Sequence, residues 1–311
     1  MNKISIVGAG MTGATTAHWL AERELADLVL VDVVEGMPQG KGLDMLEAMP
    51  IIGRDVAISG ANDYAATKDS DIIIITAGLP RKPGMSRDDL LSANAEIVGT
   101  AATETLKHAP DAIYIVLTNP LDTMAYLTMK KTGLPRERVI GQAGILDSAR
   151  MRAFVAMETG VSVENIDCYV LGGHGDEMVP LTRHSNIAGI SLKEYLPADK
   201  LEAIVARTRK GGGEIVNLLK TGSAFYAPSA ACAQMAEAIL KNKHLIVPCA
   251  AYMDGEYGLN DMFFGVPVML GRTGMERIIE YKLDDDEKTM FDKSAAAVKE
   301  THEALKKLVK I

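Results

Sequence analysis

His174 is the first candidate for chemistry, because it stands among glycines in the segment GGHG at residues 172–175. Histidine titrates near neutral pH, so its ring can take up and release a proton during a reaction. The flanking glycines let the backbone and a small ligand approach the ring closely. A structural histidine is the alternative for this position taken by itself. The other five histidines have no such setting, and we expect structural or surface roles for His18, His108, His184, His244 and His302.

Asp147 and Arg150 form a second candidate group, three residues apart in a predicted helix. Their side chains therefore share one face of that helix. A local surface ion pair is the ordinary interpretation. In the functional interpretation, Arg150 holds a substrate carboxylate with two parallel hydrogen bonds, a geometry that lysine cannot match. The pair taken by itself leaves both interpretations open.

A cationic segment follows the predicted buried strand at residues 71–76. Residues 78–87 read GLPRKPGMSR, and their two prolines and two glycines exclude a regular element. The segment starts at the edge of the sheet where ligands bind. It predicts a mobile loop that closes over an anionic substrate, with Arg81, Lys82 and Arg87 as its cations. A solvated surface loop is the alternative.

The elements that must position a cofactor near these groups begin at the N-terminus. A predicted strand at 4–7 leads into GAGMTG at 8–13, a predicted helix covers 14–24, and Asp32 ends a predicted strand at 28–31. This is the dinucleotide-binding pattern G-x-G-x-x-G with a distal acid. Gly8 allows the tight turn, Gly10 lets the backbone approach a pyrophosphate, and Gly13 lets the helix pack against the strand.

The end of the pattern also predicts which dinucleotide binds. The helix N-terminus offers unpaired N–H groups and a positive dipole to phosphates. Asp32 would accept hydrogen bonds from the ribose hydroxyls and repel a 2′-phosphate, so NAD is expected rather than NADP. Glycines at an ordinary strand–helix turn are the alternative. We expect residues 1–144 to form an NAD-binding Rossmann domain, and residues 145–311 a catalytic substrate domain.

Strands and helices alternate through the first half, which predicts an α/β fold with a doubly wound parallel sheet. The further predicted strands there are 56–58, 71–76, 113–117 and 138–140, and the further helices are 42–49, 90–108 and 121–131. The second half predicts a mixed α+β domain that covers the nucleotide site. Its predicted strands are 164–171, 179–183, 243–251 and 263–270, with a hairpin turn at 256–258 and helices at 147–159, 198–219, 228–240 and 284–309.

Composition narrows the function classes. The 311 residues are 48% hydrophobic and 24% charged, as in a globular protein with a substantial core. The net charge of −8 argues against nucleic acid as a partner, because phosphate binding needs clustered positive charge. We expect no membrane partner, since no apolar run is long enough to span a bilayer, and no signal peptide. Cys168, Cys232 and Cys249 form no metal-ligand cluster, so we expect buried thiols in the cytoplasm and no metal.

Five motifs occur in a characteristic order: GAGMTG, RKPGMSR, TNP, ILDSAR and GGHGD. Together they resemble the lactate/malate dehydrogenase superfamily, and specifically its lactate-dehydrogenase-like malate dehydrogenases, over nearly the whole chain. The resemblance implies NAD as cofactor and reversible hydride transfer between (S)-malate and NAD+, giving oxaloacetate and NADH. It also implies a place in the tricarboxylic acid cycle.

The same resemblance assigns roles to individual residues. His174 would exchange the proton of the substrate hydroxyl, and Asp147 would fix the histidine tautomer and raise the pKa of His174. Arg150 would anchor the C1 carboxylate, and Arg87 would polarise the C2 carbonyl. Asn119 would hydrogen-bond the substrate oxygen beside the nicotinamide. The implied cofactor-binding positions are Gly8, Ala9, Gly10, Met11, Thr12, Gly13, Asp32, Asn94, Leu117, Thr118 and Asn119. Ser223 is a further candidate for the pocket lining.

Arg81 predicts the substrate. Oxaloacetate has a second carboxylate that pyruvate lacks, and an unpaired carboxylate in a closed site is costly. The lactate enzymes of this family place a neutral glutamine at the matching position, so Arg81 favours malate and oxaloacetate, with Lys82 as the rival cation. A lactate or broader 2-hydroxyacid dehydrogenase and a catalytically silent NAD-binding regulator are the alternatives. The first strand begins at Lys3 without the N-terminal arm of vertebrate-type lactate dehydrogenases, so we expect a homodimer or an armless homotetramer.

Overall fold

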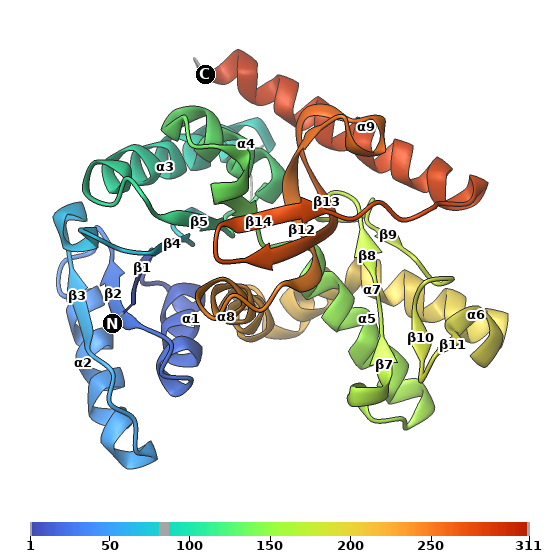
Figure 1. Ribbon diagram of the computed structural model, residues 1–311, viewed down its shortest axis with the longest axis horizontal. Coiled ribbons are helices and arrows are strands. Elements are labelled where there is room, and N and C mark those ends of the chain that lie inside the picture. The colour runs from blue at the N-terminus through green and yellow to red at the C-terminus, as the bar shows by residue number, and fades with distance from the viewer. Residues whose placement is uncertain (1, 81–86, 310–311) are drawn as a thin grey trace.

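A computed structural model describes residues 2–80 and 87–309, with only the backbone of Arg87 included. Its centre is a sheet whose described strands follow the order β14-β13-β12-β6-β5-β4-β1-β2-β3 (Figure 1). Six strands pair in parallel: β1 (Lys3–Val7), β2 (Asp27–Val31), β3 (Ile58–Ala61), β4 (Ile72–Ile75), β5 (Ile113–Val116) and β6 (Val139–Gly141). The predicted doubly wound α/β sheet is confirmed.

The central strand β4 shows why this sheet is buried on both faces. All four of its isoleucines are fully buried. Ile72 and Ile74 belong to one hydrophobic cluster, and Ile73 and Ile75 belong to another on the opposite face. A strand packed on both sides is expected to be a continuous apolar run rather than an alternating one.

Helices cover the two faces in separate groups. Helices α1 (Met11–Glu22) and α8 (Tyr226–Leu240) pack in the first cluster. Helices α3 (Arg87–His108) and α4 (Leu121–Thr132) pack in the second, together with the end of α9 (Asp285–Leu308). Figure 1 shows the two groups on opposite sides of the strands. The remaining helices are α2 (Met37–Ala48), α5 (Gly144–Thr159), α6 (Leu192–Tyr195) and α7 (Ala198–Leu219).

The second half of the chain extends the same sheet. The antiparallel strands β12 (Leu245–Asp254), β13 (Asn260–Gly271) and β14 (Gly274–Ile278) form its far edge. Strand β12 joins β6 through the pair Ala250 and Gly141. The predicted hairpin turn is confirmed as a short 3-10 helix, Glu256–Gly258, between β12 and β13. Three strands from the second half therefore continue the sheet built by the first half.

Three predicted strands were wrong in detail, and in the one predicted at 179–183 only Val179–Pro180 is a strand. Residues 164–171 contain a 3-10 helix, Val163–Asn165, and two short strands, β7 (Ile166–Asp167) and β8 (Val170–Leu171). Strand β7 pairs with β10 (Asn186–Ile187), which also pairs with β11 (Ile190–Ser191), whereas β8 pairs with β9 (Val179–Pro180). The chain thus changes sheets within the eight residues that were predicted to form one strand. Strand β3 also begins later than predicted, at Ile58. It packs closely against α2, since a Cβ at Gly60 of β3 would lie 2.2 Å from the Pro38 carbonyl carbon of α2.

Helix α9 brings the C-terminal segment back across the molecule. Its start is fixed by a capping box between Asp284 and Glu287, and Phe291 and Leu305 are fully buried along one face. This confirms the predicted helix at 284–309. None of the helices in the described ranges is both long and apolar enough to cross a membrane.

Candidate active site

The loop after β1 is built so that only glycine fits at two positions. Gly8 has φ +102° and donates its N–H to the Val31 carbonyl at 2.8 Å. A Cβ on Gly8 would lie 2.6 Å from the Ala77 nitrogen. A Cβ on Gly13 would lie 1.8 Å from the Gly8 carbonyl oxygen. The strand, loop and helix therefore pack backbone against backbone, as the spacing of the glycines predicts.

Gly10 differs from these two glycines because it faces open space. It is the N-cap residue of α1, no side chain caps the helix there, and a Cβ on Gly10 would meet no atom within 4 Å. The first N–H groups of a helix have no intrahelical partner. An open, uncapped helix N-terminus fits the pyrophosphate of NAD, with Ala9, Met11 and Thr12 as its immediate neighbours.

Asp32 is anchored directly beside this loop. Its Oδ2 accepts from the Ala9 N–H at 2.7 Å, and its Oδ1 accepts from the Val34 N–H at 3.0 Å. Lys41 of α2 reaches the same peptide and donates from Nζ to the Ala9 carbonyl at 2.7 Å. Sequence reasoning missed Lys41, because this residue lies just before the predicted helix at 42–49 and a single lysine gives no signal of a contact 32 residues away.

The loops that follow β4 and β5 are tied together by Asn94 of α3. Its side chain accepts from the Leu79 N–H at 2.7 Å and donates to the Asn119 carbonyl at 2.7 Å, and it is 1% exposed. Thr118 donates from Oγ1 to the Ala77 carbonyl at 2.7 Å. The Asn119 side chain is exposed, and Leu117 is partly buried. Asn94, Leu117, Thr118 and Asn119 therefore meet at the carboxyl edge of the sheet, where cofactors bind in such folds.

His174, Asp147 and Arg150 form a buried charged group at this edge. The His174 Nδ1 lies 2.9 Å from the Asp147 Oδ2, and the Arg150 Nη1 donates to the Asp147 Oδ1 at 3.1 Å. The Asp147 side chain is only 2% exposed, against 10% for Arg150 and 20% for His174. The surface-pair interpretation of Asp147 and Arg150 is therefore wrong, because a surface pair would be solvated.

The electrostatics of this group favour a charged histidine. The Asp147 carboxylate raises the pKa of His174 above its usual value, although burial and Arg150 oppose this. The hydrogen bond to Asp147 also leaves the Nε2 of His174 free to face a ligand. A histidine held by a buried carboxylate is suited to donate and accept a proton.

The turn that carries His174 is held from three further elements. The His174 N–H donates to Asp122 Oδ2 of α4 at 3.0 Å, and the Gly173 N–H donates to Ser294 Oγ of α9 at 3.0 Å. The Gly172 N–H donates to the Gly265 carbonyl of β13 at 2.8 Å. Sequence reasoning missed Asp122 and Ser294. Asp122 carried a weak signal, because it lies two residues after the motif TNP.

Three predicted site residues are not placed among these groups. Arg81 lies outside the described residues, as does its rival cation Lys82. Arg87 begins α3, but its side chain also lies outside the described part. Ser223 is exposed in the segment between α7 and α8. The contributions of Arg81, Arg87 and Ser223 therefore stay predictions.

The other histidines and the cysteines have the settings predicted for them. His302 is 1% exposed, and burial lowers the pKa of His302 to about 4. His184 stacks on Tyr281, His108 is partly buried, and His18 and His244 are exposed. Cys168, Cys232 and Cys249 are free and buried. The predicted burial of the three thiols is confirmed, and the structural or surface roles of the five histidines stay predictions.

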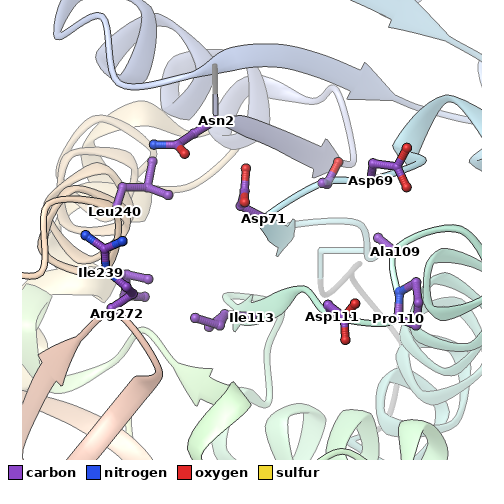
Figure 2. Close-up of a pocket in the computed structure, with 11 residues that line it drawn as sticks. Asn2, Asp69, Asp71, Ala109, Pro110, Asp111, Ile113, Ile239, Leu240 and Arg272 are labelled. Carbon is purple, nitrogen blue, oxygen red and sulfur yellow. The ribbon is translucent and has the colours of Figure 1, made fainter.

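A hollow of about 450 Å³ lies at the opposite edge of the sheet (Figure 2). It is lined by residues that precede strands, such as Asn2 before β1 and Asp71 before β4. The Asp71 Oδ2 already accepts from the Lys3 N–H at 2.7 Å. Because cofactors bind beyond the carboxyl ends of parallel strands, this hollow is not part of the candidate site.

Comparison with known proteins finds matches over nearly the whole chain. The family model for the NAD-binding domain of lactate/malate dehydrogenase matches residues 2–141, and the model for the α/β C-terminal domain matches residues 145–309. A malate dehydrogenase of Roseiflexus castenholzii is 58% identical over 306 residues, which cover 98% of this chain and 99% of the relative.

Two solved structures show the same fold. The apo malate dehydrogenase of Picrophilus torridus has a TM-score of 0.96 and 46% identity, and the match covers 99% of this chain and 98% of that one. The lactate dehydrogenase of Cryptosporidium parvum in complex with lactic acid and NAD has a TM-score of 0.95 and 39% identity, with 98% of each chain covered.

Proposed function

The chain belongs to the lactate/malate dehydrogenase family, and we propose that it acts as an NAD-dependent malate dehydrogenase, transferring a hydride reversibly between (S)-malate and NAD+ to give oxaloacetate and NADH. The observation that carries this proposal is the buried group of His174, Asp147 and Arg150 at the same sheet edge as the glycine loop. A catalytically silent regulator would have no need of a buried histidine–carboxylate pair beside a carboxylate-binding cation.

His174 moves the proton in this mechanism. In malate oxidation, its neutral ring takes the proton of the substrate hydroxyl on Nε2, and in oxaloacetate reduction its charged ring returns that proton. Asp147 accepts from Nδ1–H, which fixes the tautomer and stabilises the charged ring. NAD supplies the hydride acceptor or donor when it is bound. In this way the buried carboxylate makes proton transfer available at neutral pH.

Arginines hold the substrate. Arg150 uses one N–H on Asp147, so its remaining N–H groups are available to clamp the C1 carboxylate. Arg87, at the start of α3, polarises the C2 carbonyl, and Asn119 hydrogen-bonds the same oxygen beside the nicotinamide. The residues proposed to hold NAD are Gly8, Ala9, Gly10, Met11, Thr12, Gly13, Asp32, Asn94, Leu117, Thr118 and Asn119.

Arg81 selects oxaloacetate over pyruvate by meeting the second carboxylate. The fold itself does not choose the substrate, because a lactate dehydrogenase matches it almost as well as a malate dehydrogenase does. Arg81→Gln is expected to lower kcat/KM for oxaloacetate and relatively improve pyruvate. Lys82→Gln is the matched control and should leave the ratio unchanged. If Lys82→Gln shifts the ratio and Arg81→Gln does not, Lys82 is the selecting cation.

The direct test is the initial rate of NADH loss with purified protein. We expect fast turnover with oxaloacetate and little turnover with pyruvate, or with NADPH in place of NADH. A preference for pyruvate would move the assignment to a lactate or broader 2-hydroxyacid dehydrogenase. Equal rates with NADPH would contradict the role of Asp32. Tight NADH binding without turnover of either acid would support a regulatory protein.

The setting of the enzyme is also part of the proposal. We place it in the cytoplasm and the tricarboxylic acid cycle, with the NAD-binding part at residues 1–144 and the catalytic part at residues 145–311. Its three free thiols suit a reducing compartment. A homodimer or homotetramer is supported by the exposed apolar side chains of Leu43, Ile51 and Ile52 on α2 and the following turn, because such patches favour protein contacts. Light scattering during gel filtration measures the assembly.

A further inference from the structure

Asp122 is a buried carboxylate that the mechanism above does not use. It lies in the first turn of α4 and is 5% exposed. Its Oδ2 accepts from the His174 N–H at 3.0 Å. Its Oδ1 has no hydrogen-bond partner among the described residues. A buried carboxylate with one bare oxygen is costly for the fold, so its presence beside a catalytic histidine calls for a reason.

The charged groups around Asp122 belong to the active site. Asp147 comes from α5 and His174 comes from the turn after β8, and Arg150 of α5 acts on His174. Helix α9 brings Ser294 and Val298 to Gly173 on the same turn. His302 of α9 lies against the neighbouring Thr123, and burial lowers the pKa of His302 to about 4, so it is neutral at working pH. Asp122 is therefore the second negative charge beside His174.

We propose that Asp122 is a positioning residue that holds the main chain of His174 from α4 and stabilises the charged form of its ring, in addition to Asp147. This inference rests on the proposed dehydrogenase function, in which the charged ring is the proton donor for reduction. It differs from a purely structural role, for which any hydrogen-bond acceptor would be enough. Ser294 plays that uncharged role for Gly173.

Electrostatics support the proposal. The attraction of Asp122 adds to that of Asp147 in raising the pKa of His174. Burial raises the pKa of Asp122 itself to about 6. Asp122 is consequently charged near pH 8 and neutral near pH 4. Its support for the charged ring therefore operates at neutral and alkaline pH and disappears in acid.

Asp122→Asn is the decisive variant, because it keeps an oxygen acceptor for the His174 N–H and removes the charge. Ser294→Ala is the matched control, since it removes a hydrogen bond from the same turn without changing any charge. The readout is the pKa of the His174 ring, followed by NMR of the free protein. We expect Asp122→Asn to lower the pKa of His174 by about one unit. Ser294→Ala should leave it unchanged.

Kinetics give the second readout. In Asp122→Asn, oxaloacetate reduction should decline with rising pH about one unit earlier than in the wild type, whereas Ser294→Ala should lower the rate at every pH alike. An unchanged pKa of His174 in Asp122→Asn would overturn the proposal, and so would an equal shift in Ser294→Ala. The NMR titration needs no turnover, and the wild-type assay tests the proposed function separately, so the two failures are distinguishable.

Two measurements remain decisive even if Asp122→Asn folds poorly. In the wild type, the ¹³C signal of the Asp122 carboxyl should titrate near pH 6. A carboxyl that stays protonated through pH 9 would overturn the proposal. Thermal melting supplies the other measurement. A folded-state pKa raised above the usual 3.8 costs stability as the pH rises through it, so the melting temperature of Asp122→Asn relative to the wild type should rise from pH 4 to pH 8. A constant difference would contradict a charged Asp122.

Discussion

Two glycine-rich turns, each placed directly after a strand, serve the site by different physical means. The turn at residues 8–13 works through the absence of side chains, because a Cβ on Gly8 or Gly13 would overlap backbone atoms. The turn at residues 172–175 instead receives side chains. Asp147 of α5 holds the His174 ring, and Asp122 of α4 and Ser294 of α9 hold the backbone N–H groups.

The difference shows that the first turn provides the shape of the cofactor site, whereas the second turn provides the charges that act on His174. The first turn is mostly local. Gly13 packs on Gly8 within one strand–loop–helix unit, and the contacts of Gly8 with Val31 and Ala77 come from the ends of the neighbouring strands. The second turn is tertiary, since its supports lie 27, 52 and 121 residues away in the chain. Changes at the first turn should therefore act on folding and cofactor affinity, and changes at the second on rate and pH dependence.

Gly13→Val should have the largest effect of all. Its Cβ would lie 1.8 Å from the Gly8 carbonyl oxygen, and the backbone fixes the positions of both atoms. We expect a loss of more than about 4 kcal/mol in the free energy of unfolding and little soluble protein. Thermal melting and NADH fluorescence titration measure the outcome.

Gly10→Ala is the matched control on the same turn. No atom lies within 4 Å of the added Cβ, so the melting temperature should stay close to that of the wild type. NADH affinity should nevertheless fall by about tenfold, because the methyl group projects toward the pyrophosphate. A Gly10→Ala protein that melts like Gly13→Val would show that the two glycines do not have separate roles.

Asp147→Asn tests the charged turn, with the next largest effect. The variant leaves Arg150 without its partner and removes the main attraction on the charged His174 ring. We expect kcat/KM for oxaloacetate reduction to fall by about 10²- to 10⁴-fold, with NADH affinity unchanged. Steady-state kinetics and NADH titration on the same samples separate the two effects.

The pH dependence of Asp147→Asn has a definite sign. In the wild type the pKa of His174 is raised above 6.5, so the ring stays charged to higher pH. The variant should lose reduction activity at a lower pH, and malate oxidation, which needs the neutral ring, should extend further into acid. Stability linked to the raised pKa is present below 6.5 and lost as pH rises through the folded value, so the variant should be destabilised more at pH 6 than at pH 9. Parallel pH profiles for the two proteins would contradict this account.

The sequence predicted the local turn better than the tertiary one. Spacing alone identified Gly8, Gly10 and Gly13, because the three belong to one short motif between a predicted strand and a predicted helix. The run of four isoleucines in β4 likewise predicted a strand buried on both faces. Asp122 was missed because the hydrogen bond that its side chain accepts comes from the His174 backbone N–H, 52 positions away.

Sequence patterns also fail where one predicted strand contributes to two sheets. Residues 164–171 predicted one strand, yet β7 and β8 pair with different partners. Asp147 and Arg150 show the same limit of sequence patterns for a pair of charged residues. Their spacing predicted a shared helix face, but only the packing of α5 against α7 and β12 decides that this face is buried. Pairing and burial are properties of the whole fold and leave little trace in a short window.

The smallest catalytic effect that we predict comes from a substitution in α7, which acts on His174, Asp147 and Arg150 only by moving Arg150. Gly211 of α7 lies under Arg150, and a Cβ there would be 2.2 Å from the Arg150 Cδ. Gly211→Ala should therefore displace the guanidinium without touching His174. We expect kcat/KM for oxaloacetate to fall by about 10-fold, mostly through KM, with an unchanged pH profile. Steady-state kinetics across pH distinguish this from the behaviour of Asp147→Asn.

Gly213→Ala is the control that isolates the contact with Arg150. Gly213 lies on the same helix, but its added Cβ would meet no atom within 4 Å. Alanine in a helix interior is more stable than glycine by about 1 kcal/mol, so this variant should melt slightly higher than the wild type with unchanged kinetics. If both variants raised KM equally, the effect would come from stiffening α7 rather than from moving Arg150. If only Gly211→Ala raises KM, the effect comes from Arg150, because an added Cβ would meet the Arg150 side chain at position 211 and no atom at position 213. This result would support Arg150 as the residue that binds the substrate carboxylate.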